Sequence, residues 1–532
     1  MINKICISAK EIGIGQNITP FVIDALEQLL SSGGGILCFE KGEYHFYEQG
    51  AKEEFYGVSN NSAGVKKIAF PIVGFDGLTI DGGGSVFVFH EKVFPFVVSF
   101  SSHITIRDII FDRILPSSSS FDVFHQSPQG FQLMIDEKKV PYTVKDGVVC
   151  FHRENRDFST AEKKLSLHKV GAHDVTYLFV GDSSDSTENL PAPYMLTDAE
   201  AVDNGIYFRY RADTPVKYDA QTKQVHTVLD GGRDIDLIFL NQSNDILVRN
   251  ATVRRGIGMG IIGQLSEDIE IDQFCTDVEH YGELSTLTAD SMHFVNCRGY
   301  LNIHDCSISH TMDDVINVHG MYTSVKQVNR EKLVVGIMHQ EQAYFNPYLQ
   351  GDCLSIIDPE TLDIVATYQV EAAELSGDGR CVTLQGEVEG DIALIRQGYL
   401  VENPGRMPDL HLHHNHFSHF PRIRLSGGGE ILVEHNIIEN CCCALYASDL
   451  QEYWYESGRI RNLVFRYNQL DHCNSMGGES FIEVEVSGFD RERAPEVHRK
   501  VSILNNTVKH IKNSFIKAAG VQELVLQDNV FN

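Results

Sequence analysis

One short stretch of the chain, residues 288–320, contains the five side chains that we take as candidates for acid–base chemistry. They are Asp290, His293, Asp313, Asp314 and His319. Carboxylates held a few ångströms apart cannot all stay ionised, because each negative charge raises the pKa of its neighbours. One carboxyl then keeps a proton while the others remain bases, which is the division of roles that glycoside hydrolysis requires. We therefore expect a catalytic carboxylate site in this stretch.

The spacing of the three aspartates indicates how a fold can bring them together. Asp313 follows Asp290 by 313 − 290 = 23 residues. If the chain winds in coils of that length, the lone aspartate and the doublet lie on stacked strands about 4.8 Å apart. Asp313 and Asp314 would point to opposite faces of a regular strand, so a bend is expected there. An Asp-Asp pair alone is more often a solvated turn or a helix cap. The third aspartate one coil upstream is what favours catalysis.

A sequence motif repeated in the last third of the chain predicts such coils. It reads apolar-x-apolar-x-x-Asn-x-apolar, and its asparagines are Asn415, Asn436, Asn468, Asn506 and Asn529. The steps of 21, 32, 38 and 23 residues between them fit coils of about 20 to 25 residues, some with inserted loops. The alternating apolar positions predict short strands, and stacked bends would align the asparagines into a ladder of amides. The predicted fold is all-β, a right-handed parallel β-helix.

Two stretches interrupt this pattern, residues 116–240 and 321–408. Both contain several strand-like runs separated by Gly, Asp and Pro, which is typical of small β-barrels or sandwiches. We expect two inserted, antiparallel, barrel-like domains there. The β-helix then comprises an N-terminal cap with the first coils (1–115), the coils that carry the aspartates (241–320) and the C-terminal coils (409–532). Residues 19–30 predict a helix, capped by Thr19, that covers the first strands.

The overall composition limits the partners and the cellular compartment. The chain has 44 basic and 73 acidic residues, a formal net charge of −29, which argues against nucleic acid and anionic membranes as partners. The start lacks the apolar core of a secretory signal, so we expect a cytoplasmic protein, or a secreted or periplasmic one if a signal was removed. The twelve cysteines show no CxxC pairs and predict reduced thiols rather than a zinc site or a disulfide framework.

Two other functions remain open from the residues alone. Clustered carboxylates without cysteine would also suit Ca²⁺, as in β-helical pectate lyases. A lyase further needs a basic residue and an acidic substrate, and the candidate bases are Arg298, Arg422 and Arg424. The second alternative is a β-helix that binds glycans without catalysis.

Several motifs resemble those of glycoside hydrolase family 110, the β-helical α-1,3-galactosidases, and more distantly those of the polygalacturonases, so a polygalacturonase-like enzyme is a further alternative. The motifs are ADSMHFVNCRG, TMDDVINVHG, EYWYESGRIRNLVFRYN and, near the N-terminus, GGGILCFEKGEYHF and LTIDGGGSVFVFH. The resemblance implies an exo-acting enzyme that removes terminal α-1,3-linked galactose from an oligosaccharide or glycoconjugate, with inversion and without a metal or other cofactor. It also implies that Asp313 is the general acid and that Asp290 and Asp314 activate water.

Further residues are candidates for binding the sugar. They are His293, His319, His339, Gln340, Arg422, Arg424, Trp454 and Glu456. The Trp454 ring can stack on the apolar face of galactose, and Glu456 can accept hydrogen bonds from its hydroxyls. The arginines can bind hydroxyls or keep a carboxylate charged, and the two histidines near the aspartates can orient a carboxylate or contact the sugar. A long β-helix with barrel insertions also offers surfaces for a homodimer.

Overall fold

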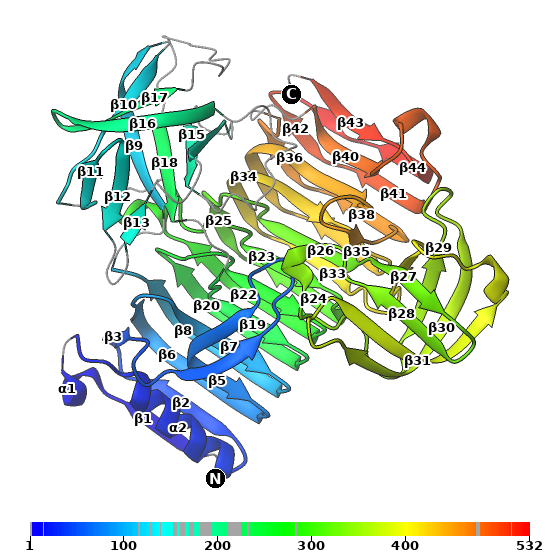
Figure 1. The fold of residues 1–532 in the computed structure, drawn as a ribbon, viewed down its shortest axis with the longest axis horizontal. Helices are drawn as coiled ribbons and strands as arrows, with labels where there is room; N and C mark the ends of the chain where they lie inside the picture. The colour runs from blue at the N-terminus through cyan, green and yellow to red at the C-terminus, as the bar shows by residue number, and fades with distance from the viewer. Residues whose placement is uncertain are drawn as a thin grey trace.

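The chain forms a parallel β-helix from which two closed barrels project (Figure 1). In this computed structural model the described residues are 3–13, 15–114, 118–127, 129–138, 140–152, 157–159, 165–169, 175–180, 194–210, 225–230, 234–281, 285–474, 479–511 and 513–532. The predicted fold class, a right-handed parallel β-helix with two inserted barrels, is confirmed.

Each coil contributes a strand to up to three parallel sheets. The first sheet contains β5 (Gly64–Val73), β7 (Val93–Ser99), β19 (Ile238–Asn241), β21 (Ile261–Gln264), β23 (Met292–Val295), β26 (Ile316–Met321), the second halves of β34 (His416–Leu425) and β36 (Ile437–Asp449), β40 (Ser480–Val486) and β43 (Ser514–Ala518). The second sheet contains β1 (Lys4–Ile7), β2 (Gly35–Phe39), the first halves of β6 (Asp76–Phe89), β8 (Ser102–Asp112), β20 (Asn244–Val253) and β22 (Glu267–Thr276), then β24 (Arg298–His304), β33 (Asp409–His413), β35 (Glu430–Glu434), β38 (Asn462–Arg466), β41 (His498–Leu504) and β44 (Val521–Gln527). The third contains β3 (Glu43–Phe46), β25 (Ser307–Ser309), β39 (Gln469–Asp471), β42 (Thr507–Lys509), β45 (Val530–Phe531) and the remaining halves of the long strands.

Alternation along each strand separates the core from the outer face. In β23, Met292 and Phe294 point into the core of the β-helix, while His293 and Val295 occupy the alternate, outward positions. Burying one such apolar side chain contributes about 1.5 to 3 kcal/mol, so a continuous column of them holds successive coils together. The outer face of the first sheet is therefore available for polar side chains.

The predicted asparagine ladder lies at the bend between the second and third sheets. Asn415 donates to Asn436 at 3.0 Å, and the series continues through Asn468 and Asn506 to Asn529. The residue before each of these asparagines has a positive φ of 53° to 56°, which turns the chain sharply. The amides then supply the partners that backbone groups lose at the turn.

The first barrel is made by β9 (Ser118–Ser127), β10 (Gly130–Met134), β14 (Leu165–Lys169), β15 (Val175–Val180), β16 (Tyr194–Val202), β17 (Gly205–Tyr210) and β18 (Val225–Asp230), beside a small sheet of β11 (Tyr142–Lys145), β12 (Val148–His152) and β13 (Asp157–Ser159). It is not wholly antiparallel as predicted, because β15 and β18 pair in parallel. Residue 116, the predicted start of this insertion, lies outside the described residues.

The second barrel contains β27 (Thr323–Val328), β28 (Lys332–Gly336), β29 (Cys353–Ile357), β30 (Ile364–Leu375), β31 (Cys381–Gly390) and β32 (Leu400–Glu402). All of its strand pairs are antiparallel. Between β28 and β29 the chain crosses the first sheet, where Ile337 and Phe345 pack against Val295 of β23. This connection forms one wall over the outer face of that sheet.

The N-terminal end is closed by helix α2 (Thr19–Ser31), which follows the short α1 (Ala9–Ile12). The helix is present as predicted, but Thr19 is its first residue rather than its cap. The hydroxyl of Thr19 donates to the carbonyl of Tyr47, and the side chain of Asn17 accepts the Thr19 N–H.

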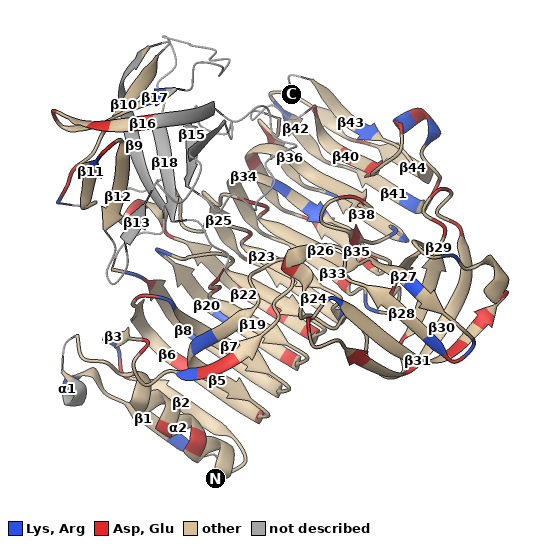
Figure 2. Ribbon diagram, viewed as in Figure 1, with Lys and Arg blue, Asp and Glu red and all other residues tan. Residues whose placement is uncertain are grey.

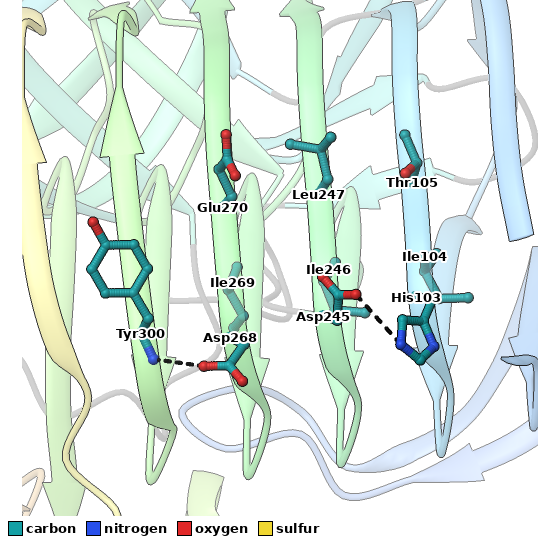
Figure 3. A pocket seen from close by; sticks show the side chains of 10 residues that line it. All are labelled: His103, Ile104, Thr105, Asp245, Ile246, Leu247, Asp268, Ile269, Glu270 and Tyr300. Atoms are coloured by element: carbon teal, nitrogen blue, oxygen red, sulfur yellow. Dashed lines mark hydrogen bonds and ion pairs between the residues drawn. The ribbon is translucent and has the colours of Figure 1, made fainter. Parts of the chain in front are cut away.

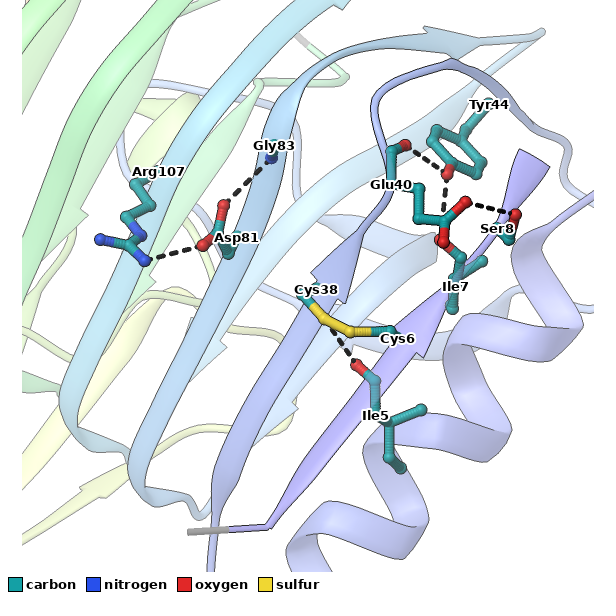
Figure 4. Close-up of a disulfide and its surroundings, with 10 residues drawn as sticks. All are labelled: Ile5, Cys6, Ile7, Ser8, Cys38, Glu40, Tyr44, Asp81, Gly83 and Arg107. Atoms are coloured by element: carbon teal, nitrogen blue, oxygen red, sulfur yellow. Dashed lines mark hydrogen bonds and ion pairs between the residues drawn. A yellow bond between two sulfur atoms is a disulfide. The ribbon is translucent and has the colours of Figure 1, made fainter. Parts of the chain in front are cut away.

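A disulfide joins Cys6 to Cys38 across the first two strands of the second sheet (Figure 4). The expectation of reduced thiols only is therefore wrong. The two cysteines are 38 − 6 = 32 residues apart but stand opposite each other in the β1–β2 register, so no short sequence spacing reveals the pair. Among the described residues, no helix is long and apolar enough to cross a membrane.

Candidate active site

The lone aspartate and the doublet meet at one edge of the first sheet. Asp313 and Asp314 occupy a bend between β25 and β26, and Asp290 lies two residues before the start of β23. β23 and β26 pair with Met292 opposite Ile316, a register that places Asp290 opposite Asp314. The N–H of Ser291 donates to the carbonyl of Asp314 at 3.0 Å. The coil between these two strands is 316 − 292 = 24 residues long, so Asp314 lies one coil after Asp290 and Asp313 comes one residue earlier.

Asp314 is buried and forms an ion pair. Its Oδ1 accepts a hydrogen bond from Nε of Arg422 at 2.9 Å, and its backbone N–H donates to Oδ1 of Asp313 at 3.0 Å. Burial raises the pKa of Asp314 well above the ordinary value for aspartate. The positive charge of Arg422 partly offsets this effect, while the carboxylates of Asp313 and Asp290 add to it. Asp314 is thus a stronger proton acceptor than a surface aspartate. Asp313 is only half-buried.

Asp290 is also buried, and its Oδ2 lies 2.6 Å from Nδ1 of His293. The other ring nitrogen of His293 lies 2.9 Å from Nε2 of His319. Both histidines are buried on the outer face of the first sheet. They contact each other and a carboxylate, so the structure brings both predicted histidines to the aspartates.

Glu456 is a buried charge at the centre of a second group of contacts. It lies on β37 (Glu456–Ser457), which pairs with the end of β26. Its Oε2 lies 2.8 Å from Nε of Arg424, and its Oε1 accepts from Nδ2 of Asn60 at 2.9 Å. Burial alone would raise the pKa of Glu456, but Arg424, together with His319, lowers it to about 2. Glu456 is therefore ionised and already bound within the protein.

The aromatic candidates form a small cluster next to this group. The ring of Trp454 lies 4.3 Å from that of His339, and the Tyr453 ring lies 5.2 Å from His339. His339 is buried, whereas Gln340 is exposed at the start of the 3₁₀ turn η3 (Gln340–Gln342). Trp454 itself is half-buried.

A loop from the N-terminal coils contributes residues that the sequence did not suggest. Residues 57–63 connect β4 (Lys52–Tyr56) to β5, and Asn60 in this loop reaches Glu456. Oε1 of Gln264 accepts the N–H of Ser59 at 3.0 Å, and Asn61 donates to the buried Asp236 at 2.6 Å. The segment VSNNS has the composition of an ordinary polar turn, so no sequence signal points to a role in the site.

Two buried amide groups at the site were also missed. The side-chain nitrogen of Gln342 donates to the carbonyl of Trp454 at 2.7 Å, and that of Asn317 lies 3.4 Å from Oε1 of Glu456. Within the described part of the chain, Oε1 of Gln342 and Oδ1 of Asn317 have no hydrogen-bond partner. A buried acceptor without a partner costs free energy unless a ligand or water satisfies it. Asn317 lies within the motif TMDDVINVHG, where its outward position in β26 was the available signal.

Curated relatives resemble the chain over almost its whole length. Alpha-1,3-galactosidase B of Bacteroides thetaiotaomicron is 25% identical over 96% of this chain and 83% of its own. Alpha-1,3-galactosidase A of Shewanella woodyi is 25% identical, covering 98% and 85%, and an alpha-1,3-galactosidase B of Phocaeicola vulgatus is 26% identical, covering 97% and 84%. The resemblance to the α-1,3-galactosidases is confirmed. No family model matches the chain.

Solved structures similar to this chain include two polygalacturonases. The exopolygalacturonase of Thermotoga maritima aligns with all of this chain and 93% of its own, at 11% identity and a TM-score of 0.43. The family 28 exopolygalacturonase of Yersinia enterocolitica aligns with 99% of this chain and 78% of its own, at 11% identity and a TM-score of 0.38.

The calcium alternative fits the donor set poorly. Asp314 is paired with Arg422 and Asp290 with His293. Side chains of the protein thus already neutralise two of the carboxylates that would have to bind Ca²⁺. Three groups of His, Asp and Glu among the described residues are close enough to hold a metal ion, and none of them includes the three aspartates. Arg298, a candidate base for a lyase, pairs with Glu267 on the second sheet instead.

A separate groove of about 410 Å³ crosses the second sheet (Figure 3). Its lining residues come from β8, β20, β22 and β24 and include Asp245, Asp268 and Tyr300. The N–H of Tyr300 donates to Oδ1 of Asp268 at 3.0 Å. This groove lies on a different sheet from the aspartates at β23 and β26.

Proposed function

We propose that the protein is an exo-acting glycoside hydrolase that removes terminal α-1,3-linked galactose with inversion. The observation that carries this proposal is the register of β23 and β26, which aligns Asp290 with Asp314, whose N–H donates to Oδ1 of Asp313. The names of the relatives support galactose as the sugar. In this proposal Asp290, Asp313 and Asp314 are the catalytic residues.

Asp313 is the general acid in this mechanism. It is the most exposed of the three aspartates, as suits a group that must reach the glycosidic oxygen. Asp290 and Asp314 together hold the attacking water, and one of them takes its proton. As the water oxygen bonds to the anomeric carbon, the bond to the leaving oxygen breaks, and that oxygen receives the proton of Asp313. Each carboxyl regains its starting state by exchange with solvent after the products leave.

The buried contacts around Glu456 suit the binding of a single sugar. The partnerless oxygens of Asn317 and Gln342 are acceptors for sugar hydroxyls. The ring of Trp454 offers an apolar surface, and the connection between β28 and β29 together with the loop 57–63 restricts the space over the sheet. Walls on several sides favour removal of a terminal residue over cleavage inside a polymer. Formation of a homodimer and the absence of a metal requirement remain part of the proposal.

The decisive experiment follows galactose release from an α-1,3-linked galactobiose by ¹H NMR. The protein should release galactose, and the β anomer should appear first because the mechanism inverts the α linkage. Asp313→Asn should reduce kcat at least about a hundredfold, since general acid catalysis contributes roughly 10²- to 10⁴-fold.

Asp305→Asn is the matched control, because Asp305 precedes the bend at Cys306 on the other side of the coil. It should leave kcat unchanged, as should pretreatment of the protein with a chelator. Release of the α anomer first would contradict inversion, and no release from any α-1,3-galactoside would contradict the function.

A further inference from the structure

A chain of hydrogen bonds runs from a backbone carbonyl to Asp290. Nδ1 of His319 lies 2.6 Å from the carbonyl oxygen of Gly320, and Nε2 of His319 lies 2.9 Å from Nε2 of His293. Nδ1 of His293 lies 2.6 Å from Oδ2 of Asp290. The two imidazole rings meet nearly at right angles, at 85°. All three side chains are buried.

These contacts determine where the protons are. A carbonyl oxygen only accepts, so Nδ1 of His319 carries a proton. Burial lowers the pKa of His319 to about 4, although Glu456 opposes this effect, so at neutral pH its Nε2 has no proton and accepts. Nε2 of His293 must then be the donor. One further proton lies between Nδ1 of His293 and Asp290, because two acceptors would otherwise face each other at 2.6 Å.

We propose that His293 is a positioning residue, held by neutral His319 as a doubly protonated imidazolium that keeps Asp290 ionised and fixed through Oδ2. This inference rests on the proposed function of Asp290 and deepens it. His293 then contacts Asp290 rather than the sugar, and the ionised Asp290 takes the proton of the attacking water. During turnover His293 keeps both of its ring protons, and Asp290 returns the water's proton to solvent.

The charges around the two histidines are consistent with one imidazolium. Oε1 of Glu456 lies 3.6 Å from Nε2 of His319, and the positive charge of His293 contributes to the lowered pKa of Glu456. Arg424 neutralises Glu456, and on the neighbouring coil Arg422 neutralises Asp314. The cation on His293 therefore faces Asp290 and, across His319, the Arg424–Glu456 pair.

The first test is ¹⁵N NMR of histidine-labelled full-length protein, with the ring of His293 assigned from its loss in His293→Asn. At pH 7 both ring nitrogens of His293 should show imidazolium shifts, and His319 should show a protonated Nδ1 and an unprotonated Nε2. An unprotonated ring nitrogen on His293 would overturn the proposal. This measurement needs no activity, so absent galactose release would reject the proposed function and leave the result on His293 standing.

The second test compares variants by kinetics. An Asn side chain places its amide nitrogen near the position of Nδ1 of His, so His293→Asn keeps a donor to Asp290 that cannot lose a proton. His293→Leu removes the donor. We expect Leu to reduce kcat roughly a hundredfold with little change in KM, and Asn to restore most of the rate. A higher KM with unchanged kcat in both variants would instead assign His293 to sugar binding and overturn the proposal.

Discussion

At the scale of single residues, the function of the site depends on which cationic side chain pairs with each of its buried carboxyl groups. Arg422 pairs with Asp314 and Arg424 with Glu456, and both guanidinium groups lie about 5 Å from the ring of Tyr446, at 5.1 and 5.2 Å. Each buried negative charge thus has its own partner. Removing one cation should change one carboxyl group and leave the others in place.

Arg422→Met tests this arrangement. Without the guanidinium, the pKa of Asp314 rises further, because burial and the neighbouring carboxylates then act unopposed. Since Asp314 must be ionised to activate water, the acidic limb of the kcat/KM profile should move to higher pH, and the rate at neutral pH should fall at least about tenfold. Arg461→Met, at an exposed pair with Glu430, should change neither. An unshifted acidic limb would show that Asp314 does not take part in water activation.

The stability of the protein should also depend on pH through His319. Its pKa is about 4 in the folded protein, against an ordinary value of 6.5, so folding favours the neutral ring. The associated stability is fully present above pH 6.5 and is lost as the pH falls from 6.5 to 4, amounting to roughly 3 kcal/mol. Glu456 adds a loss at lower pH, between its ordinary value of 4.5 and its folded value of about 2. Urea unfolding at pH 7.5 and 4.5 measures the first effect, which should be smaller in His319→Gln. An equal loss in the variant would contradict this origin.

How far the sequence predicted the site depends on distance along the chain. Asp290 and the doublet are one coil apart, so their spacing alone places them together. Asn60 and Glu456 are 396 residues apart, and both insertions lie between them in the sequence. No local pattern encodes such a contact. Gln342 was missed for a different reason. Gln340, two residues earlier, is also a glutamine but is exposed, so residue type alone does not show which of the two lies in the site.

At the scale of elements, the asparagine ladder joins the C-terminal coils. The amide of Asn468 takes part in four hydrogen bonds, with Val433, Asn436 and Asn506. The repeated sequence motif predicted this ladder in detail, since asparagine recurs at the same position of each coil. The capping of α2 and the parallel pair β15–β18 were not predicted, because they depend on tertiary contacts that local propensity does not contain.

Asn468→Ala should therefore destabilise the protein by about 2 to 4 kcal/mol, because it leaves buried backbone groups without partners. Asn529→Ala, at the half-buried end of the same ladder, should cost about half as much. Chemical denaturation followed by circular dichroism compares the two variants. Equal losses at both positions would mean that the ladder does not act through its buried interior.

At the scale of the whole molecule, the net charge of −29 bears on the choice of substrate. Figure 2 shows acidic and basic segments interspersed over the coils and the second barrel. The composition argued against anionic membranes as partners, and no helix among the described residues is long and apolar enough to cross a membrane. It did not reveal the Cys6–Cys38 disulfide, because that pair is set by the stacking of the first two strands.

A neutral galactoside should be insensitive to this negative field, whereas a polyanion should be repelled by it. Raising NaCl from about 0.05 M to about 0.5 M should change kcat/KM on α-1,3-galactobiose by less than about twofold, because screening acts on charged partners only. Polygalacturonate should neither be cleaved nor inhibit the reaction at low salt. Hydrolysis of polygalacturonate would instead favour the polygalacturonase alternative.

The pairing of β8 with β20 has a consequence for the history of the molecule. Ser102 lies opposite Asn244, and their neighbours pair one for one, although 244 − 102 = 142 residues separate them. The β-helix therefore continues from the coil of β8 to the coil of β20 whatever segment is inserted between these two strands. A lineage can therefore shorten, lengthen or exchange the module carried there without shifting the next turn by one residue. Such proteins can diversify what surrounds the substrate while the turn that carries the chemistry stays unchanged.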